Sequence, residues 1–404
     1  MWKPKKILIL LAVIVLAFPI FTANVVKAEE KKPDDLKTTT ESGLYLPSRS
    51  WRGGMHYGST EFKIETHAFL DLEYIDAERQ GSRNGISHFD NHHANVFFDA
   101  ELRPNLRGHI EVEYEHSGGS IDIDNAVMSW ATTPWLTLDI GRFYTPFGIE
   151  RFVWYSPINP LVSRPVAFQA IIPGSFYANG LMASGNVGPE AKFFAQSGQL
   201  RLTYEVAATD GLGQSAAIKR RDSRQARDNN SSRAISGRVA VILWPWVEVG
   251  SSYHTQKYLD SGDEDLQFVG LDLSARWKGW ELRAESVTAS VERIAQDSGG
   301  APVLDPSGNP TPLPDLDQNG WYAQLGYTFI WDRDLFPAVT LVTRYNSVDL
   351  DKEVTGNDDQ KVLSLGVNVM IYDHFRAKVE YQQASEKGVA KDNDAFLGQF
   401  VMDF

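Results

Sequence analysis

One stretch of the sequence, between Arg142 and Tyr177, combines charged and aromatic side chains in a way that suits contact with polar solutes. Between its ends lie eight aromatic residues and five prolines, which is too apolar a composition for a solvated surface loop. Its charged residues are Arg142, Glu150, Arg151 and Arg164, and guanidinium groups bind carboxylate and phosphate oxygens through several N–H donors. We expect this stretch to fold inward over apolar surface, and a lid over an outer rim is the alternative.

Histidines form a second group with the capacity for chemistry. Ser87-His88 and His92-His93 flank Asp90, and such a combination can bind a metal ion or assist hydrolysis. A partner elsewhere in the chain is not evident from the sequence, so we interpret these residues as a solvated polar loop. We therefore assign no catalytic residue, no metal site and no cofactor.

The chain contains no cysteine, which excludes disulfides, thiolate metal sites and a Cys-x-x-Cys-His haem attachment.

A separate basic run, residues 219–228, holds five cations and two acids. This run suits an anion-attracting vestibule or contact with lipopolysaccharide phosphates, and the alternative is an ordinary solvated loop tip. Both interpretations stay open.

The elements that must position these residues follow a two-residue period from Glu61 onward. Val96, Phe98 and Ala100 alternate with Asp99 and Glu101, and the same alternation recurs to the C-terminus. We count about sixteen such segments of roughly ten residues, long enough to cross a bilayer when tilted. Strands of soluble sheets are shorter, at about five to six residues.

Connection lengths separate a membrane barrel from a soluble β-rich periplasmic protein. Short turns such as Arg103-Pro104-Asn105 alternate with long connections, for which we expect 77–92, 142–178, 209–232, 292–318 and 349–360. Tight turns at one rim and long loops at the other are typical of outer-membrane barrels. We predict an all-β fold, a transmembrane antiparallel β-barrel of about 16 strands over residues 61–404. By strand count its third long loop is the stretch from Arg142 to Tyr177, and we expect this loop to fold inward.

Alternation also assigns charged side chains to the inner face of this barrel. Opposed charges across a pore create a transverse field that orients dipolar solutes, whereas wall salt bridges are the alternative role for each single residue. We predict that the pore constriction is formed by Arg142, Glu150, Arg151, Arg164, Arg238, Arg344, Arg376 and Lys378.

The N-terminus has the layout of an export signal. Three lysines precede an apolar run, Ile7 to Phe21, and Val26-Lys27-Ala28 then places small residues before Glu29. We predict a signal peptide over residues 1–28 and a flexible periplasmic segment over residues 29–60. Loss of four lysines would change the net charge from −13 to −17, which excludes nucleic acid as a partner attracted by bulk charge.

The last strand ends in Phe404, with apolar residues at alternate positions before it. This ending resembles the signal read by the barrel assembly machinery of the outer membrane. We therefore expect the cell outer membrane as the location. The expected partners are outer-membrane lipid and lipopolysaccharide, the assembly machinery, and small hydrophilic solutes or anions.

Several short motifs resemble the phosphate-selective porin O and P family: Gly141–Glu150 (GRFYTPFGIE), Ser163-Arg164-Pro165, Tyr204–Gly211 (YEVAATDG), and Arg344-Tyr345 with Val348-Asp349-Leu350. The resemblance implies a 16-stranded porin and the option of a homotrimer. Phosphate-selective members of that family line their constriction with lysines, whereas the stretch here contains only arginines. We therefore expect a general or weakly anion-selective pore.

Three other classes of function compete with a passive porin. A barrel enzyme would need a nucleophile and a histidine on the wall. A barrel sleeve around a partner, such as an electron-carrying protein, would need more strands, because its lumen must hold a protein. A transporter of hydrophobic solutes would need an apolar lumen, and we expect charged inner faces.

Overall fold

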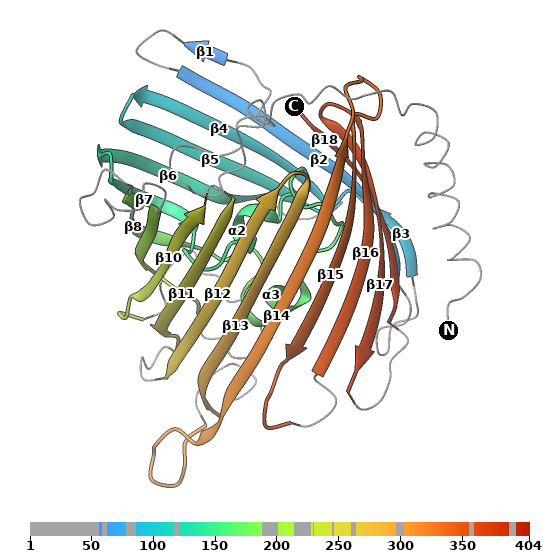
Figure 1. Cartoon of the computed structure of the whole chain (residues 1–404). Coiled ribbons are helices and arrows are strands. Elements are labelled where there is room, and N and C mark those ends of the chain that lie inside the picture. The colour runs from blue at the N-terminus through green and yellow to red at the C-terminus, as the bar shows by residue number, and fades with distance from the viewer. Residues whose placement is uncertain are drawn as a thin grey trace.

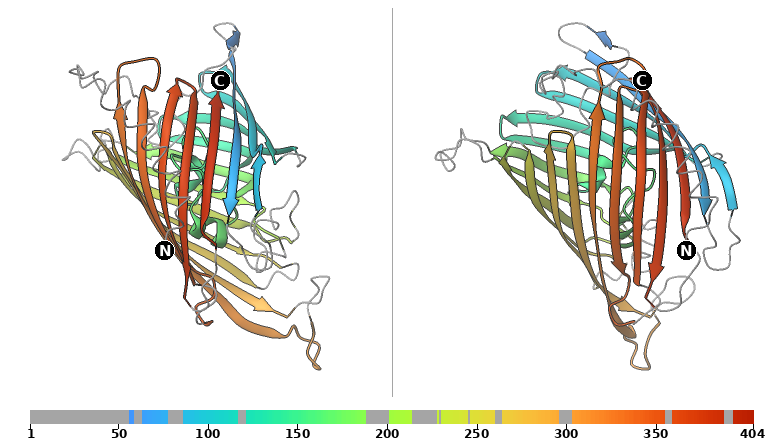
Figure 2. Two further views of the ribbon diagram at one scale, coloured as in Figure 1. Left: turned by 90° about the vertical axis from the view of Figure 1, so that its right-hand side faces the viewer. Right: turned by 45° about the vertical axis from the view of Figure 1, so that its right-hand side comes forward.

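A computed structural model describes residues 56–58, 63–77, 86–116, 121–187, 201–213, 228, 230–244, 246–259, 264–295, 303–354, 359–387 and 393–404. The predicted signal peptide, nearly all of the predicted periplasmic segment and nearly all of the basic run 219–228 lie outside these residues. Within them the chain is almost entirely β-strand, and Figures 1 and 2 show long tilted strands that follow one another around a ring.

The strands follow the alternation of the sequence, and they are β1 (His56–Gly58), β2 (Lys63–Ala77), β3 (Ile86–Asp90), β4 (His93–Arg103), β5 (Leu106–Glu115), β6 (Ile121–Thr133), β7 (Leu136–Tyr144), β8 (Tyr177–Val187), β9 (Arg201–Thr209), β10 (Ala234–Trp244), β11 (Val247–Lys257), β12 (Asp265–Trp277), β13 (Trp280–Ile294), β14 (Pro312–Ile330), β15 (Ala338–Asp349), β16 (Asp359–Tyr372), β17 (Phe375–Glu386) and β18 (Ala395–Asp403). Two short helices, α2 (Glu150–Val153) and α3 (Val166–Ile171), lie between β7 and β8.

All strand pairs are antiparallel and the sheet closes on itself, because β18 pairs with β2 and β9 with β10. The described residues form 18 strands in this sheet. β3 and β4 pair with successive halves of β2 and so make one wall strand, while β1 adds three residues beside one end of β2. Sixteen wall strands remain, which confirms the prediction. Closure leaves no wall strand with an unpaired edge.

Burial alternates along each wall strand. On β12, Phe268 and Asp272 are buried, whereas Val269 and Leu271 are 48% and 60% exposed. An apolar outer face with a different inner face is what a lipid-surrounded barrel requires. Among the described residues, no helix is long and apolar enough to cross a membrane.

Tryptophans mark one rim of the barrel. Six of them flank three tight turns and are 46–56% exposed: Trp130, Trp135, Trp244, Trp246, Trp277 and Trp280. Indole rings favour the level of the lipid headgroups, so these side chains form part of an aromatic girdle at the short-turn rim.

The connections alternate in length as the sequence predicts, with three differences. One is that the expected connection 292–318 is shorter, because β13 runs to Ile294 and β14 begins at Pro312. The first long connection is shorter than the expected 77–92, because residues 86–90 pair with β2 as β3. β8 ends and β9 begins at the short-turn rim, and the residues between them, 188–200, lie outside the described residues. Residues 145–176 form the third connection at the long-loop rim, after those that follow β2 and β5.

The segment between β7 and β8 as candidate functional site

Residues 145–176, which we call the β7–β8 segment, bond to inward side chains on several parts of the ring. The Ile149 amide donates to Glu285 on β13 at 2.8 Å, and the Val162 amide donates to Glu380 on β17 at 2.9 Å. The Tyr155 hydroxyl donates to Glu111 on β5 at 2.8 Å. The segment is therefore tied to wall strands that are far apart around the barrel (Figure 1).

The start of the segment and α3, near its end, pack against an apolar patch on β12 to β15. Phe168 of α3 meets Tyr322 edge to face with ring centroids 5.7 Å apart, and Phe147 meets Phe268 in the same way at 6.0 Å. Ala167 and Ile171 are fully buried beside them. The patch comprises Leu266, Phe268, Val287, Ala289, Val291, Leu316, Tyr322 and Val348.

This patch corrects the expectation that the inner face is charged throughout. Burying a large apolar side chain contributes about 1.5–3 kcal/mol, so α3 and the patch stabilise each other by exclusion of water. Gly320 permits the close approach, because a Cβ there would lie 2.8 Å from both Ala167 Cβ and Ile171 Cδ1. The alternation of the sequence did not reveal this patch or that α3 covers it.

The middle of the segment packs against the opposite part of the wall. Trp154 stacks on Tyr155 with ring centroids 4.4 Å apart, and Tyr155 meets Phe69 of β2 edge to face at 5.9 Å. Tyr144 and Tyr177, at the two ends of the segment, belong to the same buried cluster. The aromatic content noted in the sequence thus lies against the barrel wall.

Within the segment, the predicted charges are largely paired. Glu150 accepts from Arg164 Nε at 2.7 Å and from Nη2 at 2.8 Å, a bidentate geometry. Burial by itself would lower the pKa of Arg164, but the Glu150 carboxylate raises it above the ordinary value. Arg151 is buried and hydrogen-bonded to Glu205 of β9. Arg142 stands apart, with its guanidinium carbon 4.0 Å from the Tyr177 ring centroid.

Three of the predicted wall cations hold the segment. Lys378 donates to the Ser156 carbonyl at 2.6 Å, and Arg344 donates to the Ser163 carbonyl at 3.0 Å. Arg376 bonds to the Pro157 carbonyl and to Asp403. These side chains satisfy backbone acceptors of the segment, which anchors it to β15 and β17.

Arg238 belongs to a different group on the wall. Its guanidinium bonds to Glu248 and Asp272, in each case at 2.6 Å for the closest pair of atoms. It also lies opposite Glu205, the partner of Arg151, in the register of β9 and β10. Seven of the eight predicted residues therefore fall into two groups. Arg151 and Arg238 lie around Glu205, whereas Glu150 and Arg164 lie near the three wall cations that hold the segment. Arg142 lies apart from both groups, beside Tyr177.

A cavity of about 180 Å³ separates the segment from β13 to β17. Pro157, Ile158 and Pro160 line one side, and Arg283 and Arg376 are on the other with Glu281. The Nε atoms of both arginines are buried without a hydrogen-bond partner. Arg283 is a further candidate for contact with solutes that the predicted site did not include. No local feature of the sequence around Arg283 indicates that the segment lies opposite it.

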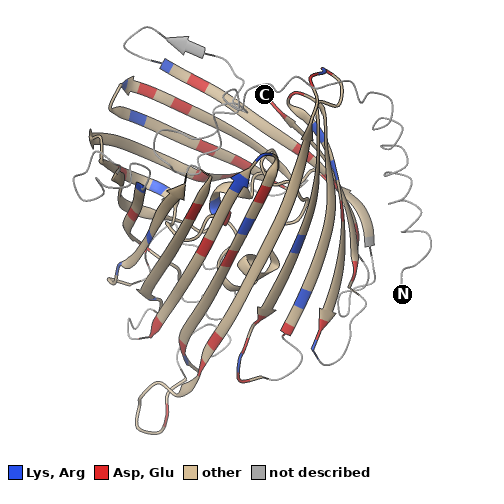
Figure 3. Cartoon of the chain, viewed as in Figure 1, with Lys and Arg blue, Asp and Glu red and all other residues tan. Residues whose placement is uncertain are grey.

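The buried charges are unevenly distributed around the ring. Five buried carboxylates come from β2, β5 and β6: Asp71, Glu73, Glu111, Glu113 and Asp124. Over the described parts of β2 to β6, no lysine or arginine is buried. The buried cations of the described chain come from the segment and from β10 to β17, and Figure 3 shows both signs along the strands.

A closed ring of sixteen antiparallel strands with an apolar outer face and a polar inner wall defines an outer-membrane channel. Residues 91–402 match the family model described as phosphate-selective porin O and P. The chain therefore belongs to the phosphate-selective porin O and P family, which confirms the resemblance of its motifs. It is an outer-membrane porin, a passive channel.

Known relatives and solved structures agree on the fold. An uncharacterized protein of Aquifex aeolicus (strain VF5) is 21% identical over 329 residues, which cover 76% of this chain and 73% of the relative. An anion-selective porin from Comamonas acidovorans is 12% identical, with a TM-score of 0.58 over 85% of this chain and 100% of that one. OmpF of Salmonella typhi in complex with daunomycin is 13% identical, with a TM-score of 0.54 over 87% of this chain and 100% of that one.

Proposed function

We propose that this porin passes small hydrophilic solutes with a preference for anions, phosphate-type anions included, and that the β7–β8 segment is its constriction. The observation that carries this proposal is the set of bonds from the segment to Glu111, Glu285 and Glu380 on separate parts of the ring. A segment held inside a ring on several sides narrows the passage beside it.

The cavity beside Pro157 supports the preference for anions. Two guanidinium groups, Arg283 and Arg376, face it with one carboxylate, Glu281. Their buried Nε–H groups have no acceptor, and a buried donor without a partner favours a ligand that supplies an oxygen. The family description and the name of the Comamonas acidovorans porin agree with this preference.

The same residues argue for a broad anion preference rather than phosphate specificity. The segment contains no lysine, and Arg151 and Arg164 are neutralised by Glu205 and Glu150. The described parts of β2 to β6 bury carboxylates without a buried lysine or arginine, whereas β10 to β17 bury four cations and four carboxylates, and this difference would set up a field across the pore that orients dipolar solutes. Channel rather than enzyme chemistry is what the family and the fold support.

A sleeve for a partner protein fits the geometry less well than a solute channel does. Such a sleeve needs its lumen free, whereas the segment here is bonded to β5, β13 and β17.

We further propose that residues 1–28 are removed on export, that residues 29–60 form a flexible periplasmic segment, and that the porin associates as a homotrimer. N-terminal sequencing of the mature protein is expected to begin at Glu29, and a start at Met1 would contradict removal.

Single-channel recording in a planar bilayer tests the proposed function. Under a KCl gradient we expect stepwise conductance with a reversal potential that favours chloride, and added phosphate should reduce the chloride current. A reversal potential that favours potassium would refute the anion preference. Correctly folded protein that produces no steps would refute the passive channel itself.

A further inference from the structure

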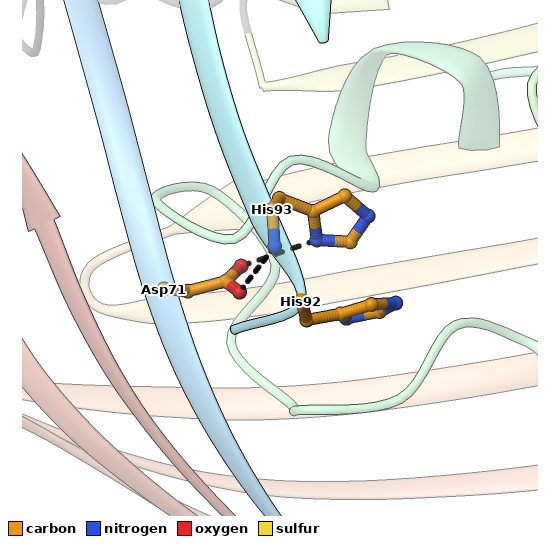
Figure 4. A group of neighbouring side chains, drawn as sticks. All are labelled: Asp71, His92 and His93. Carbon is orange, nitrogen blue, oxygen red and sulfur yellow. Dashed lines mark hydrogen bonds and ion pairs between the residues drawn. The ribbon is translucent and has the colours of Figure 1, made fainter. Parts of the chain in front are cut away.

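The His92-His93 pair occupies a break in the barrel wall, where β3 ends at Asp90 and β4 begins at His93. In an unbroken strand, consecutive side chains point to opposite faces. Here the two imidazole rings lie on the same side, with centroids 3.7 Å apart. Figure 4 shows both rings near Asp71, which reaches toward them from β2.

The donor atoms of these three residues have metal-site spacing. Asp71 Oδ2 lies 3.2 Å from His93 Nδ1, and ligand atoms of Asp71, His92 and His93 all lie within 4.8 Å of one another. Two ligands at about 2.1 Å from a tetrahedral zinc ion are roughly 3.4 Å apart. Glu73 Oε1 is not part of this mutually close group, but it lies 2.9 Å from His92 Nδ1 and offers a further carboxylate oxygen beside it.

The surroundings hold these donors in place. Asp71 is fully buried and accepts hydrogen bonds from the His93 amide at 2.9 Å and from the Ser156 hydroxyl. His93 packs beside Trp154 of the β7–β8 segment with ring centroids 5.5 Å apart. Outer partners that orient carboxylate and imidazole ligands are a regular feature of protein metal sites.

The cluster is partly exposed to solvent through His92. The His92 side chain is 24% exposed, and it also forms a second group of donors with Glu115 and His116. His116 is 51% exposed, so an ion that reaches the second group is one shared ligand away from the buried one. Two imidazoles and two carboxylates suit zinc and similar ions better than calcium or magnesium.

We propose that Asp71, His92 and His93, with Glu73, form a binding site for Zn²⁺ or a similar divalent transition-metal ion. The sequence alone placed the two histidines in a solvated loop, because Asp71 and Glu73 lie about twenty residues away and become neighbours only through the pairing of β2 with β3 and β4. The ion would tie β2 to the break in the next wall strand, beside the segment residue Ser156. This site does not depend on the anion preference.

Co²⁺ and Zn²⁺ titrations of the full-length porin in detergent, free of any polyhistidine tag and treated with EDTA, test the site. We expect one Co²⁺ per chain with the visible absorption of a four-coordinate ion, displaced by Zn²⁺. Substitutions His92→Ala and His93→Ala should each weaken binding at least tenfold. The matched control is His88→Ala, whose side chain is exposed on β3.

The same variants distinguish binding from misfolding. Zn²⁺ should raise the Tm of the wild type and of His88→Ala but not that of His93→Ala or of the closer mimic His93→Gln. Far-UV circular dichroism establishes that each variant retains its sheet. Wild-type protein that binds no Co²⁺, or a loss in His88→Ala equal to that in His93→Ala, would overturn the proposal. Reversal potentials need not change in any of these variants, so the channel proposal stands or fails separately.

Discussion

At the scale of single residues, the charged side chains of the inner wall have two different roles. Lys378, Arg344 and Arg376 donate to backbone carbonyls of the β7–β8 segment and so act as anchors. Arg283 donates to Glu281 and keeps an unpaired Nε beside the cavity. Residue type alone does not distinguish a charged side chain that anchors the segment from one that contacts solute. For this reason the sequence analysis assigned both kinds to one predicted constriction.

Arg283 is the residue that tests anion preference most directly, because it does not anchor the segment. Two unit charges 4 Å apart interact by about 1 kcal/mol in water, which corresponds to roughly a fivefold change in relative permeability. We expect Arg283→Gln to lower the chloride-to-potassium permeability ratio by about that factor. Arg103→Gln removes one exposed charge at the turn after β4 and should leave the ratio unchanged. Equal ratios for wild type and Arg283→Gln would place selectivity elsewhere.

At the scale of elements, α3 is too short to be stable alone and depends on the wall it covers. Its buried face, Ala167, Phe168 and Ile171, matches the apolar patch of β12 to β15. A helix of this length gains little from its own hydrogen bonds, so tertiary packing supplies its stability. The position of the segment is thus set by apolar contact at α3 and by hydrogen bonds of residues 156–163, before α3, with Glu380 and Lys378.

Two glycines on β14 test the role of this packing. A Cβ at Gly320 would press on α3 at 2.8 Å, whereas at Gly326 the nearest atoms are 3.6 Å away. Overpacking of this kind typically costs about 1–3 kcal/mol. We expect Gly320→Ala to speed hydrogen exchange in the β7–β8 segment and to make the channel current noisier, with little effect from Gly326→Ala. Similar exchange in both variants would show that α3 is held by other contacts.

At the scale of the whole molecule, the pairing of β18 with β2 joins the last wall strand to the first and closes the barrel. Phe404 and Ala68 exchange two backbone hydrogen bonds of 2.8 and 2.9 Å at this seam. The Phe404 side chain is 54% exposed on the lipid side, as is that of Phe400 at 52%. The Phe404 ring therefore contributes about as much to the stability of the folded barrel as any other lipid-facing ring, such as that of Phe400.

That comparison separates assembly from stability. We expect Phe404→Ala to reduce the amount of assembled barrel in the outer membrane several-fold, because we predict that the terminal aromatic residue is the signal read by the barrel assembly machinery. The folded fraction should keep the Tm of the wild type, since the backbone bonds of the seam remain. Phe400→Ala serves as the control for loss of a lipid-facing ring and should assemble normally. An equal yield for both variants would contradict the role of Phe404 in assembly.

The sequence by itself determined the barrel, the number of wall strands, the third long connection and the family. Each of these depends on local pattern: the two-residue alternation, the spacing of turns, and short motifs such as Gly141–Glu150. Local pattern suffices because a strand in lipid must carry its apolar face at every second position.

Only the tertiary structure decided which inward residues meet. Lys378 binds the Ser156 carbonyl across 222 positions of sequence, and Arg151 binds Glu205 across 54. The apolar patch under α3 and the neighbours of His92 and His93 arise in the same way. A closed ring brings together strands that are remote in sequence. The strand register and the path of the β7–β8 segment determine which side chains meet, and neither of them produces a periodic pattern in the sequence.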